Sequence, residues 1–196
     1  MKKIFLALAV LVLTFSTQII ADTSNSIQRI YEGNKDAKVT IITYESLTCG
    51  HCADFHKNVY PQLKKEFIDA GLVKIEFRHF PLDMAALNAS KIAQCNNDGK
   101  SDLLHFLFSN QKKWAIGETV ETANENLKKL LKDENIVIDF EKCTNNKKIE
   151  DYVLNDRIEG VKKFKVNATP TIIINNKKFD KSLNYKNLKK LIEKLI

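Results

Sequence analysis

The chain has 196 residues, of which 44% are hydrophobic and 28% charged, with four cysteines and a formal net charge of +7. This length indicates one domain, or one domain with an insertion, and excludes two full-sized domains. The near-average composition excludes a disordered, collagen-like or coiled-coil protein, and four cysteines are too few for a disulfide-stapled mini-protein.

The N-terminus has the features of a secretory signal peptide over residues 1–21. Two lysines precede an uncharged apolar run over residues 4–15, and Ala21 stands before a polar stretch. We predict cleavage after Ala21 and export to a compartment where disulfide bonds persist. The alternative is a retained anchor helix, but Gln18 interrupts the run, which is only marginally long enough to span a bilayer. We expect no stable membrane insertion after cleavage.

The next segments predict a β-α-β unit. Residues 22–36 are polar and are expected to form a leader before the folded domain. The β-branched run over residues 39–44 predicts a buried strand. Apolar residues at steps of three to five then predict a helix over residues 52–70, which Gly71 ends, and a second strand follows over residues 72–80. The expected connection is a right-handed crossover.

The periodicity then becomes helical, which predicts an all-helical insertion over residues 83–164 inside an α/β domain made of residues 37–82 and 165–196. After the insertion, two adjacent asparagines suit the left-handed backbone of a tight hairpin turn between two strands. The predicted elements are helices over residues 84–97, 101–114, 121–132, 139–144 and 147–164, strands over 171–174 and 178–179, and a final amphipathic helix over 184–196.

A C-x-x-C motif, Cys49 and Cys52, lies between the first predicted strand and the first turn of the following helix. The free backbone N–H groups and the helix dipole at this position stabilise a thiolate on Cys49. A protonated His51 would lower the pKa of Cys49 further. A stabilised thiolate favours the reduced form and makes the disulfide a stronger oxidant.

Other uses of a C-x-x-C motif fit this sequence less well. A zinc site needs two more ligands, and no second C-x-x-C or H-x-x-x-H accompanies this motif. Haem attachment requires a histidine directly after the second cysteine, where this chain has Ala53. A purely structural disulfide across so short a loop is geometrically tight. We therefore predict a redox-active disulfide with no metal and no other cofactor.

Seven segments follow one another along the chain: Tyr44, Ser46–Cys52, Phe77–Asp83, Cys95, Gln111–Trp114, Phe140–Cys143 and Val166–Thr171. Together they resemble the DsbA-like family of periplasmic thiol:disulfide oxidoreductases, particularly its alphaproteobacterial branch. The resemblance covers the chain from about residue 39 onward. It implies an α/β, thioredoxin-like fold with an inserted all-helical domain.

The resemblance assigns roles to matching residues. Cys49 is the attacked, exposed sulfur and Cys52 is its buried partner. Thr169 and Pro170 form the substrate-side loop, where a cis bond before the proline would turn the Thr169 backbone outward to pair with an extended substrate segment. A proline at the start of a strand is otherwise often only an edge or turn residue.

The resemblance also implies a structural disulfide between Cys95 and Cys143. From the residues alone, these cysteines are either two buried small hydrophobic side chains or, in an exported protein, an oxidised pair.

The sequence departs from the family at one position. The family usually has a glutamate six residues before the first cysteine, which assists proton movement near the buried sulfur, whereas this chain has Thr43. Glu45 lies two residues on, hence on the same strand face. Either Glu45 takes over part of the proton relay, or it is a solvated charge at the end of the strand.

The remaining histidines, His56, His79 and His105, are expected to have surface or packing roles, and Trp114 and the cluster over residues 106–108 are expected in the core of the insertion. Paired lysines recur once per element without interleaved aromatic residues. This pattern is typical of solvated faces and turns, so we predict no nucleic-acid partner.

These features together predict an exported, periplasmic dithiol oxidase that donates its Cys49–Cys52 disulfide to reduced or unfolded exported proteins. The resemblance implies reoxidation by a quinone-linked membrane partner. Two alternatives are a thioredoxin-like reductase or isomerase, and a redox-independent binding or chaperone module for exported chains.

Overall fold

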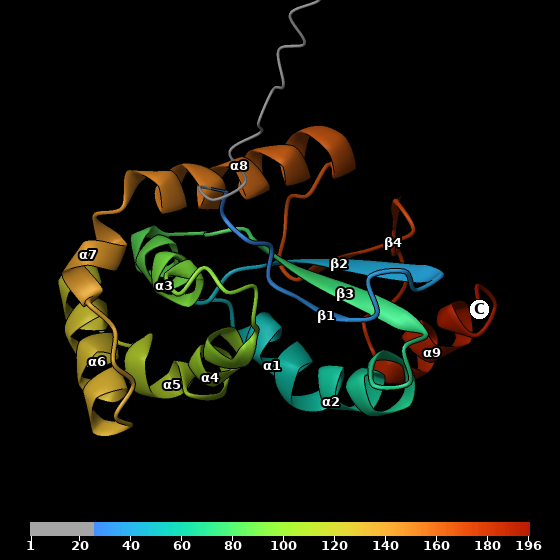
Figure 1. The fold of residues 1–196 in the computed structure, drawn as a ribbon, viewed down its shortest axis with the longest axis horizontal. Coiled ribbons are helices and arrows are strands. Elements are labelled where there is room, and N and C mark those ends of the chain that lie inside the picture. The colour runs from blue at the N-terminus through green and yellow to red at the C-terminus, as the bar shows by residue number, and fades with distance from the viewer. Residues whose placement is uncertain (1–25) are drawn as a thin grey trace, which may run out of the picture.

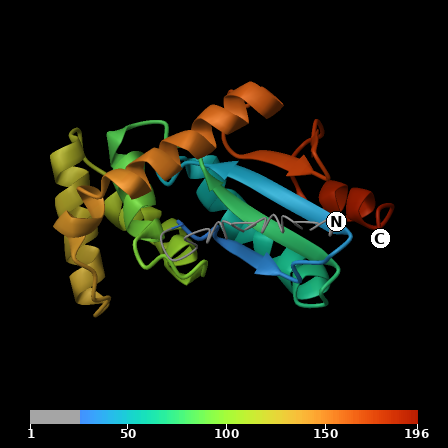
Figure 2. The ribbon, with the colours of Figure 1, turned by 45° about the horizontal axis from the view of Figure 1, so that its top comes forward.

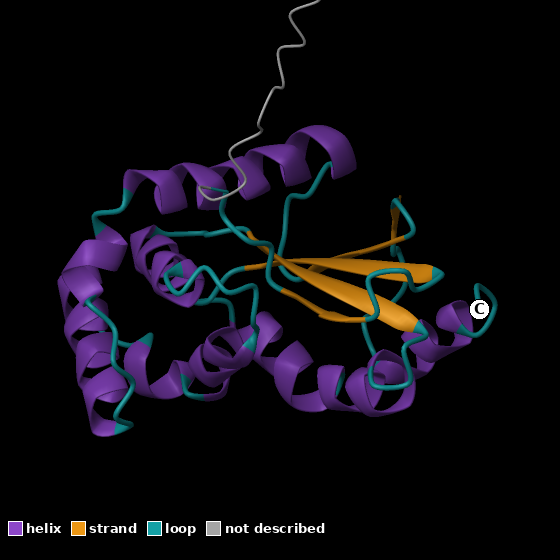
Figure 3. Ribbon diagram, in the orientation of Figure 1, coloured by secondary structure: helices purple, strands orange, loops and turns teal. Residues whose placement is uncertain are grey.

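The computed structural model describes residues 26–196 as a five-stranded sheet with helices on both faces (Figures 1 and 3). The strand order is β1-β3-β2-β4-β5, in which β2 and β3 are parallel and the other neighbours are antiparallel. The strands are β1 (Tyr31–Gly33), β2 (Val39–Glu45), β3 (Val73–His79), β4 (Thr171–Ile174) and β5 (Lys177–Lys178).

The helices form two groups. Helices α1, α2 and α9 cover one face of the sheet and α8 covers the other, while α3 to α7 gather at one end of the sheet (Figures 1 and 2). Their bounds are α1 (Gly50–Asn58), α2 (Tyr60–Leu63), the π-helical turn η2 (Lys64–Ile68), α3 (Met84–Gln94), α4 (Asp102–Ser109), α5 (Gln111–Trp114), α6 (Val120–Asp133), α7 (Phe140–Thr144), α8 (Lys147–Phe164) and α9 (Tyr185–Ile192).

The predicted signal peptide over residues 1–21 lies outside the described residues. Within residues 26–196, no helix combines the length and the apolar character needed to cross a membrane.

The predicted leader contributes a strand to the sheet. β1 pairs antiparallel with β3, and the preceding Ile30 is buried and accepts a hydrogen bond from the Phe77 N–H. Pattern reasoning missed β1 because the strand is three residues long and exposes its first and last residues, so it shows no apolar alternation.

Two predicted helices are interrupted. The helix predicted over residues 52–70 divides into α1, α2 and η2, because Pro61 has no N–H to donate to the carbonyl group four residues earlier. The helix predicted over residues 101–114 divides into α4 and α5 at Asn110, whose φ of −105° and ψ of 13° leave the helical region. The final helix, predicted over residues 184–196, ends at Ile192.

The hairpin turn after β4 forms as predicted. Asn175 and Asn176 both have positive φ angles, 45° and 66°, which suit a tight turn between antiparallel strands. β5 begins one residue earlier than predicted.

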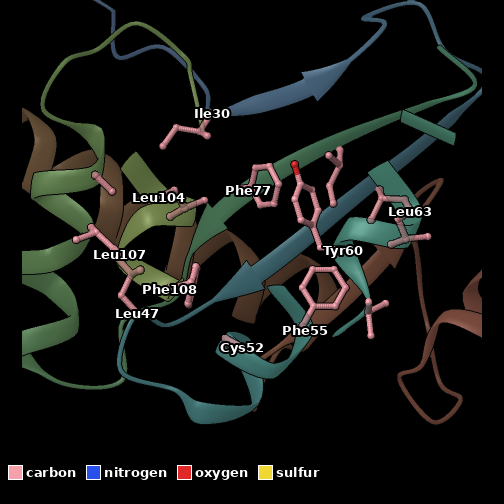
Figure 4. Close-up of a cluster of buried hydrophobic side chains, with 14 of the residues drawn as sticks. Ile30, Leu47, Cys52, Phe55, Tyr60, Leu63, Phe77, Leu104, Leu107 and Phe108 are labelled. Carbon is pink, nitrogen blue, oxygen red and sulfur yellow. The ribbon is translucent and has the colours of Figure 1, made fainter. Parts of the chain in front are cut away.

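The core is shared between the sheet and the helical insertion. Phe77 of β3 and Phe55 of α1 belong to the same buried cluster as Leu104, Leu107 and Phe108 of α4 (Figure 4). Cys52 belongs to the same cluster, so α4 and α1 share the buried core on which the C-x-x-C motif lies.

α8 covers the opposite face of the sheet, and it contacts Tyr44 through Gly160, where no larger residue fits. A Cβ atom at Gly160 would lie 2.8 Å from Cε1 of Tyr44 on β2, closer than side-chain atoms approach one another. Gly160 therefore allows α8 to lie against the buried ring of Tyr44.

Candidate active site

The two cysteines of the C-x-x-C motif begin α1 immediately after β2. Cys49 is the N-cap residue, with an extended backbone, and no side chain caps the N–H groups of the first turn. Cys49 is half-buried and Cys52 is buried, and both are free thiols in this structure. The unpaired N–H groups and the positive end of the helix therefore face the Cys49 sulfur.

The surroundings of Cys49 favour its thiolate. A hydrogen bond from the Cys52 thiol outweighs burial and lowers the pKa of Cys49 from 9.0 to about 5. The Thr169 side chain and the backbone N–H groups of Cys52 and His51 lower this pKa further. The Thr169 hydroxyl is buried and has no hydrogen-bond partner among the described residues, so it is available to donate to the thiolate. The His51 side chain itself is exposed.

Cys52 has the opposite environment. Burial raises its pKa, and the hydrogen bond to Cys49 and the negative charge of Glu45 raise it further, while a backbone hydrogen bond from Ser46 opposes the shift. At neutral pH, Cys49 is therefore a thiolate and Cys52 keeps its proton. One motif thus holds two sulfurs with very different acidities.

The segment Thr169-Pro170 lies opposite the motif. Its peptide bond is cis, and the carbonyl oxygen of Thr169 lies 3.3 Å from the Cys49 sulfur, although the two residues are 120 positions apart in the chain. An open groove of about 910 Å³ begins at this point. Its walls are formed by His51, Asp54, Phe55, Asn58, Val59, Gln62, Thr169, Pro170, Leu183, Asn184, Tyr185 and Lys186.

Glu45 lies inside the protein at the end of β2. Its side chain is 3% exposed, its Oε2 atom lies 2.9 Å from Nε2 of His56, and its Oε1 atom is buried with no hydrogen-bond partner among the described residues. The interpretation of Glu45 as a solvated strand-end charge is therefore wrong. Thr43, at the position where the family usually has its glutamate, is fully buried and only approaches the Glu76 carbonyl at 3.5 Å.

Two histidines expected to have surface or packing roles are hydrogen-bonded to each other. His56 stacks on Phe108 with ring centroids 4.0 Å apart, and its Nδ1 atom lies 2.9 Å from Nδ1 of His105. Nε2 of His105 lies 2.7 Å from Oε1 of Glu32. Sequence reasoning missed this connection because the residues come from different elements and share no short motif.

His79 has a packing role. It is buried, and its Nε2 atom lies 3.3 Å from Oε1 of Gln94. Trp114 is also buried, as predicted for a residue in the core of the insertion. Its indole N–H donates a hydrogen bond to the Leu107 carbonyl.

The other two cysteines, Cys95 and Cys143, are joined by a disulfide bond. The bond links the C-terminal end of α3 to α7, with Cα atoms 5.5 Å apart and 48 residues between them in sequence. Among residues 26–196, no group of histidine, cysteine, aspartate and glutamate side chains is arranged to hold a metal ion.

Comparison with known proteins gives consistent matches. A protein-family model described as thioredoxin matches residues 25–194. The crystal structure of Wolbachia pipientis alpha-DsbA1 superposes with a TM-score of 0.74 and 31% sequence identity, covering 85% of this chain and 90% of that one.

Two sequence relatives extend the comparison. A Rickettsia bellii protein whose name describes a protein-disulfide oxidoreductase is 29% identical over 147 residues, which are 73% of this chain and 55% of the relative. Disulfide bond formation protein D of Bacillus subtilis is 28% identical over 176 residues, covering 83% of this chain and 74% of the relative. This chain thus spans about half the length of the curated Rickettsia relatives that it matches.

Proposed function

Because this chain belongs to the thioredoxin family, in its DsbA-like branch, we propose that it is a periplasmic protein-disulfide oxidoreductase, exported by a signal peptide cleaved after Ala21. It donates its Cys49–Cys52 disulfide to reduced cysteines of exported proteins. The observation that carries this proposal is the placement of Cys49 at the N-cap of α1, 3.3 Å from the carbonyl oxygen before the cis Pro170, with Cys52 buried behind it. These surroundings lower the pKa of Cys49 and raise that of Cys52. A thiolate stabilised on Cys49 favours the dithiol form, so the disulfide form is an oxidant.

The reaction consists of two exchanges. A substrate thiolate attacks the Cys49 sulfur, the Cys49–Cys52 bond breaks, and its electron pair leaves on the Cys52 sulfur, which takes up one proton. Cys49 is then joined to the substrate in a mixed disulfide. A second substrate thiolate attacks the substrate sulfur of that bond and releases the Cys49 thiolate with the oxidised substrate. Two electrons pass from the substrate to the enzyme.

Thr169 and Pro170 bind the substrate in this proposal. The Thr169 carbonyl lies beside the attacked sulfur, and both residues border the groove that starts there. A groove with apolar walls such as Phe55 and Leu183 suits an unfolded segment that exposes apolar side chains next to its cysteine. Backbone groups of Thr169 would pair with such an extended segment whatever its sequence.

Glu45 exchanges a proton with Cys52 in this proposal. Three observations support the role: Glu45 is buried, its charge acts on Cys52, and its Oε1 atom has no hydrogen-bond partner among the described residues. Glu45 thereby replaces the acid that the family usually has at position 43. After turnover, we expect a quinone-linked membrane partner to reoxidise the Cys49–Cys52 pair.

The test is disulfide transfer by the purified, oxidised protein to a reduced, unfolded substrate protein. We expect stoichiometric oxidation of the substrate and a reduction potential well above that of thioredoxin, about −270 mV. The Cys49→Ser variant is the control and should transfer nothing. A potential near that of thioredoxin would indicate the reductase instead. Suppression of substrate aggregation that survives Cys49→Ser would indicate the chaperone module.

A further inference from the structure

A row of four ionisable side chains leads away from the C-x-x-C motif. Glu45, His56, His105 and Glu32 are joined by three contacts, at 2.9 Å from Glu45 Oε2 to His56 Nε2, 2.9 Å between the two Nδ1 atoms, and 2.7 Å from His105 Nε2 to Glu32 Oε1. They come from β2, α1, α4 and the edge strand β1. We call these four residues the histidine relay.

The contact lengths determine how many protons the histidine relay holds. Two lone pairs repel at 2.7–2.9 Å, so each of the three contacts must contain one proton. Two neutral imidazoles bring only two protons. The third is an extra proton, which sits on either carboxylate or makes either imidazole cationic. Moving each proton across its own contact transfers this extra proton from one end of the relay to the other.

The inner end of the relay lies one turn of α1 from the buried cysteine, because His56 follows Cys52 by four residues and both side chains are buried. The charge of Glu45 acts on Cys52, and the Glu45 Oε1 atom remains unpaired among the described residues. His79 is the other titratable group beside this end, in register with Glu45 across β2 and β3 and affected by its charge. The inner end therefore lies near enough for the charge of Glu45 to act on the sulfur that gains and loses a proton.

The outer end of the relay reaches solvent. The side chain of His105 is 23% exposed and that of Glu32 is 15% exposed, compared with 4% for His56. Glu32 is held by hydrogen bonds from Tyr60, Ser101 and Lys64, which together with His105 lower its pKa against the effect of burial. Asp69, which pairs with Lys64, and Asp102 are the remaining charges that act at this end.

Between its ends, the relay is enclosed by aromatic side chains. His56 packs against Phe55, Phe77 and Phe108, and His105 stacks on Tyr60 with ring centroids 4.4 Å apart. These rings leave the His56 side chain only 4% exposed, at the edge of an open pocket. The hydrogen-bonded side chains therefore form a continuous path for a proton between Glu45 and the solvent at Glu32.

We propose that the histidine relay conducts the proton that Cys52 gains when the Cys49–Cys52 disulfide is reduced and loses when it is reoxidised. The inference rests on the proposed thiol–disulfide exchange. When the disulfide breaks, the Cys52 thiolate takes a proton from the Glu45 end, and one proton enters from solvent at the His105–Glu32 end. His56, His105 and Glu32 act through Glu45 and are positioning residues. A buried thiolate is a poor leaving group, so proton delivery speeds the exchange.

The test is the rate at which reduced glutathione reduces the oxidised full-length protein, measured by quenched flow from pH 5 to 9. His105→Ala removes one link and leaves a cavity that is partly open to solvent. We expect its rate to fall about tenfold, less than the roughly hundredfold or more that a direct proton donor contributes, because His105 acts through Glu45. Added imidazole should restore the rate, whereas pyrazole, which has the same size but is a far weaker base, should not. The equilibrium constant with glutathione should change less than twofold.

The control is His79→Ala, because His79 is a buried histidine that lies outside the relay and bonds to Gln94 instead. Its rate should stay within twofold of the unsubstituted protein, with no response to imidazole. If His105→Ala does not fold, His105→Gln replaces it, with the same loss of rate and a flattened pH profile expected. An unchanged rate, equal rescue by pyrazole, or equal loss in His79→Ala overturns the relay. Failure of the unsubstituted protein to react with glutathione overturns the proposed function instead.

Discussion

The two cysteine pairs of this chain lie in opposite physical environments. Cys49 and Cys52 are three residues apart at the start of α1, beside N–H donors and the Thr169 hydroxyl, and both are free. Cys95 and Cys143 are 48 residues apart, between α3 and α7, and are bridged.

The difference shows what decides the use of a disulfide. Donors aimed at one sulfur stabilise its thiolate, which makes the bond between Cys49 and Cys52 easier to reduce. The bond between Cys95 and Cys143 instead closes a long loop between two helices, which restricts the unfolded chain and stabilises the fold. The same bond is therefore reactive in one region and structural in the other.

The largest expected effect is the loss of disulfide transfer in Cys49→Ser, because no other sulfur can form the mixed disulfide. A Cys95→Ala, Cys143→Ala double variant should keep transfer within a few-fold of the unsubstituted protein. Both are measured by oxidation of a reduced substrate protein. Equal loss in the two variants would remove the distinction between a reactive and a structural pair.

The stability of the fold should depend on the Cys95–Cys143 bond rather than on the Cys49–Cys52 bond. The Cys95→Ala, Cys143→Ala variant should lose about 4 kcal/mol of unfolding free energy on the loop-entropy model. Denaturant unfolding of the oxidised proteins measures this loss. Reduction of the Cys49–Cys52 bond should not cost a comparable amount, because its loop is short and its dithiol form is stabilised. A larger loss on reducing this bond would contradict the comparison.

The acidity of Cys49 should give a clear pH signature. Its pKa is about 5 in the folded protein, below its ordinary value of 9.0. The resulting stabilisation of the reduced protein is fully present above pH 9 and is lost as the pH falls through about 5. Alkylation of Cys49 by iodoacetamide should therefore reach half its maximal rate near pH 5, while Cys52 stays unreactive. A midpoint near 9 would contradict the assigned environment.

The same titration should appear in the reduction potential of the Cys49–Cys52 pair. Below pH 5, reduction takes up two protons and the potential should fall by about 59 mV per pH unit. Above it, only Cys52 takes up a proton, so the slope should halve to about 30 mV per pH unit. A single slope from pH 4 to 8 would show that Cys49 does not titrate there.

The smallest expected effect is that of His51→Ala. The His51 side chain is exposed, and His51 lowers the pKa of Cys49 through its backbone N–H, which the substitution keeps. The alkylation midpoint should rise by less than about one pH unit, as expected for a screened surface charge. Thr169→Val is the comparison variant, since it removes a buried donor, and should shift the midpoint more.

The order of most elements was predictable because it depends on local patterns. The strand over residues 39–44, the switch to helical periodicity after residue 83 and the Asn175–Asn176 turn all follow from residues near one another in sequence. β1 and the break at Asn110 were not predictable, because their causes are pairing with β3 and the packing of short helices.

The sequence by itself determined the C-x-x-C motif at a strand–helix junction, because helix termini and sulfur spacing are local properties. Only the tertiary structure decided that Glu45 is buried and that His56 and His105 meet. These contacts span 11 and 49 residues and depend on how α4 packs against α1 and the sheet. Burial and hydrogen bonding between distant residues set the protonation of a side chain, and local sequence patterns do not contain that information.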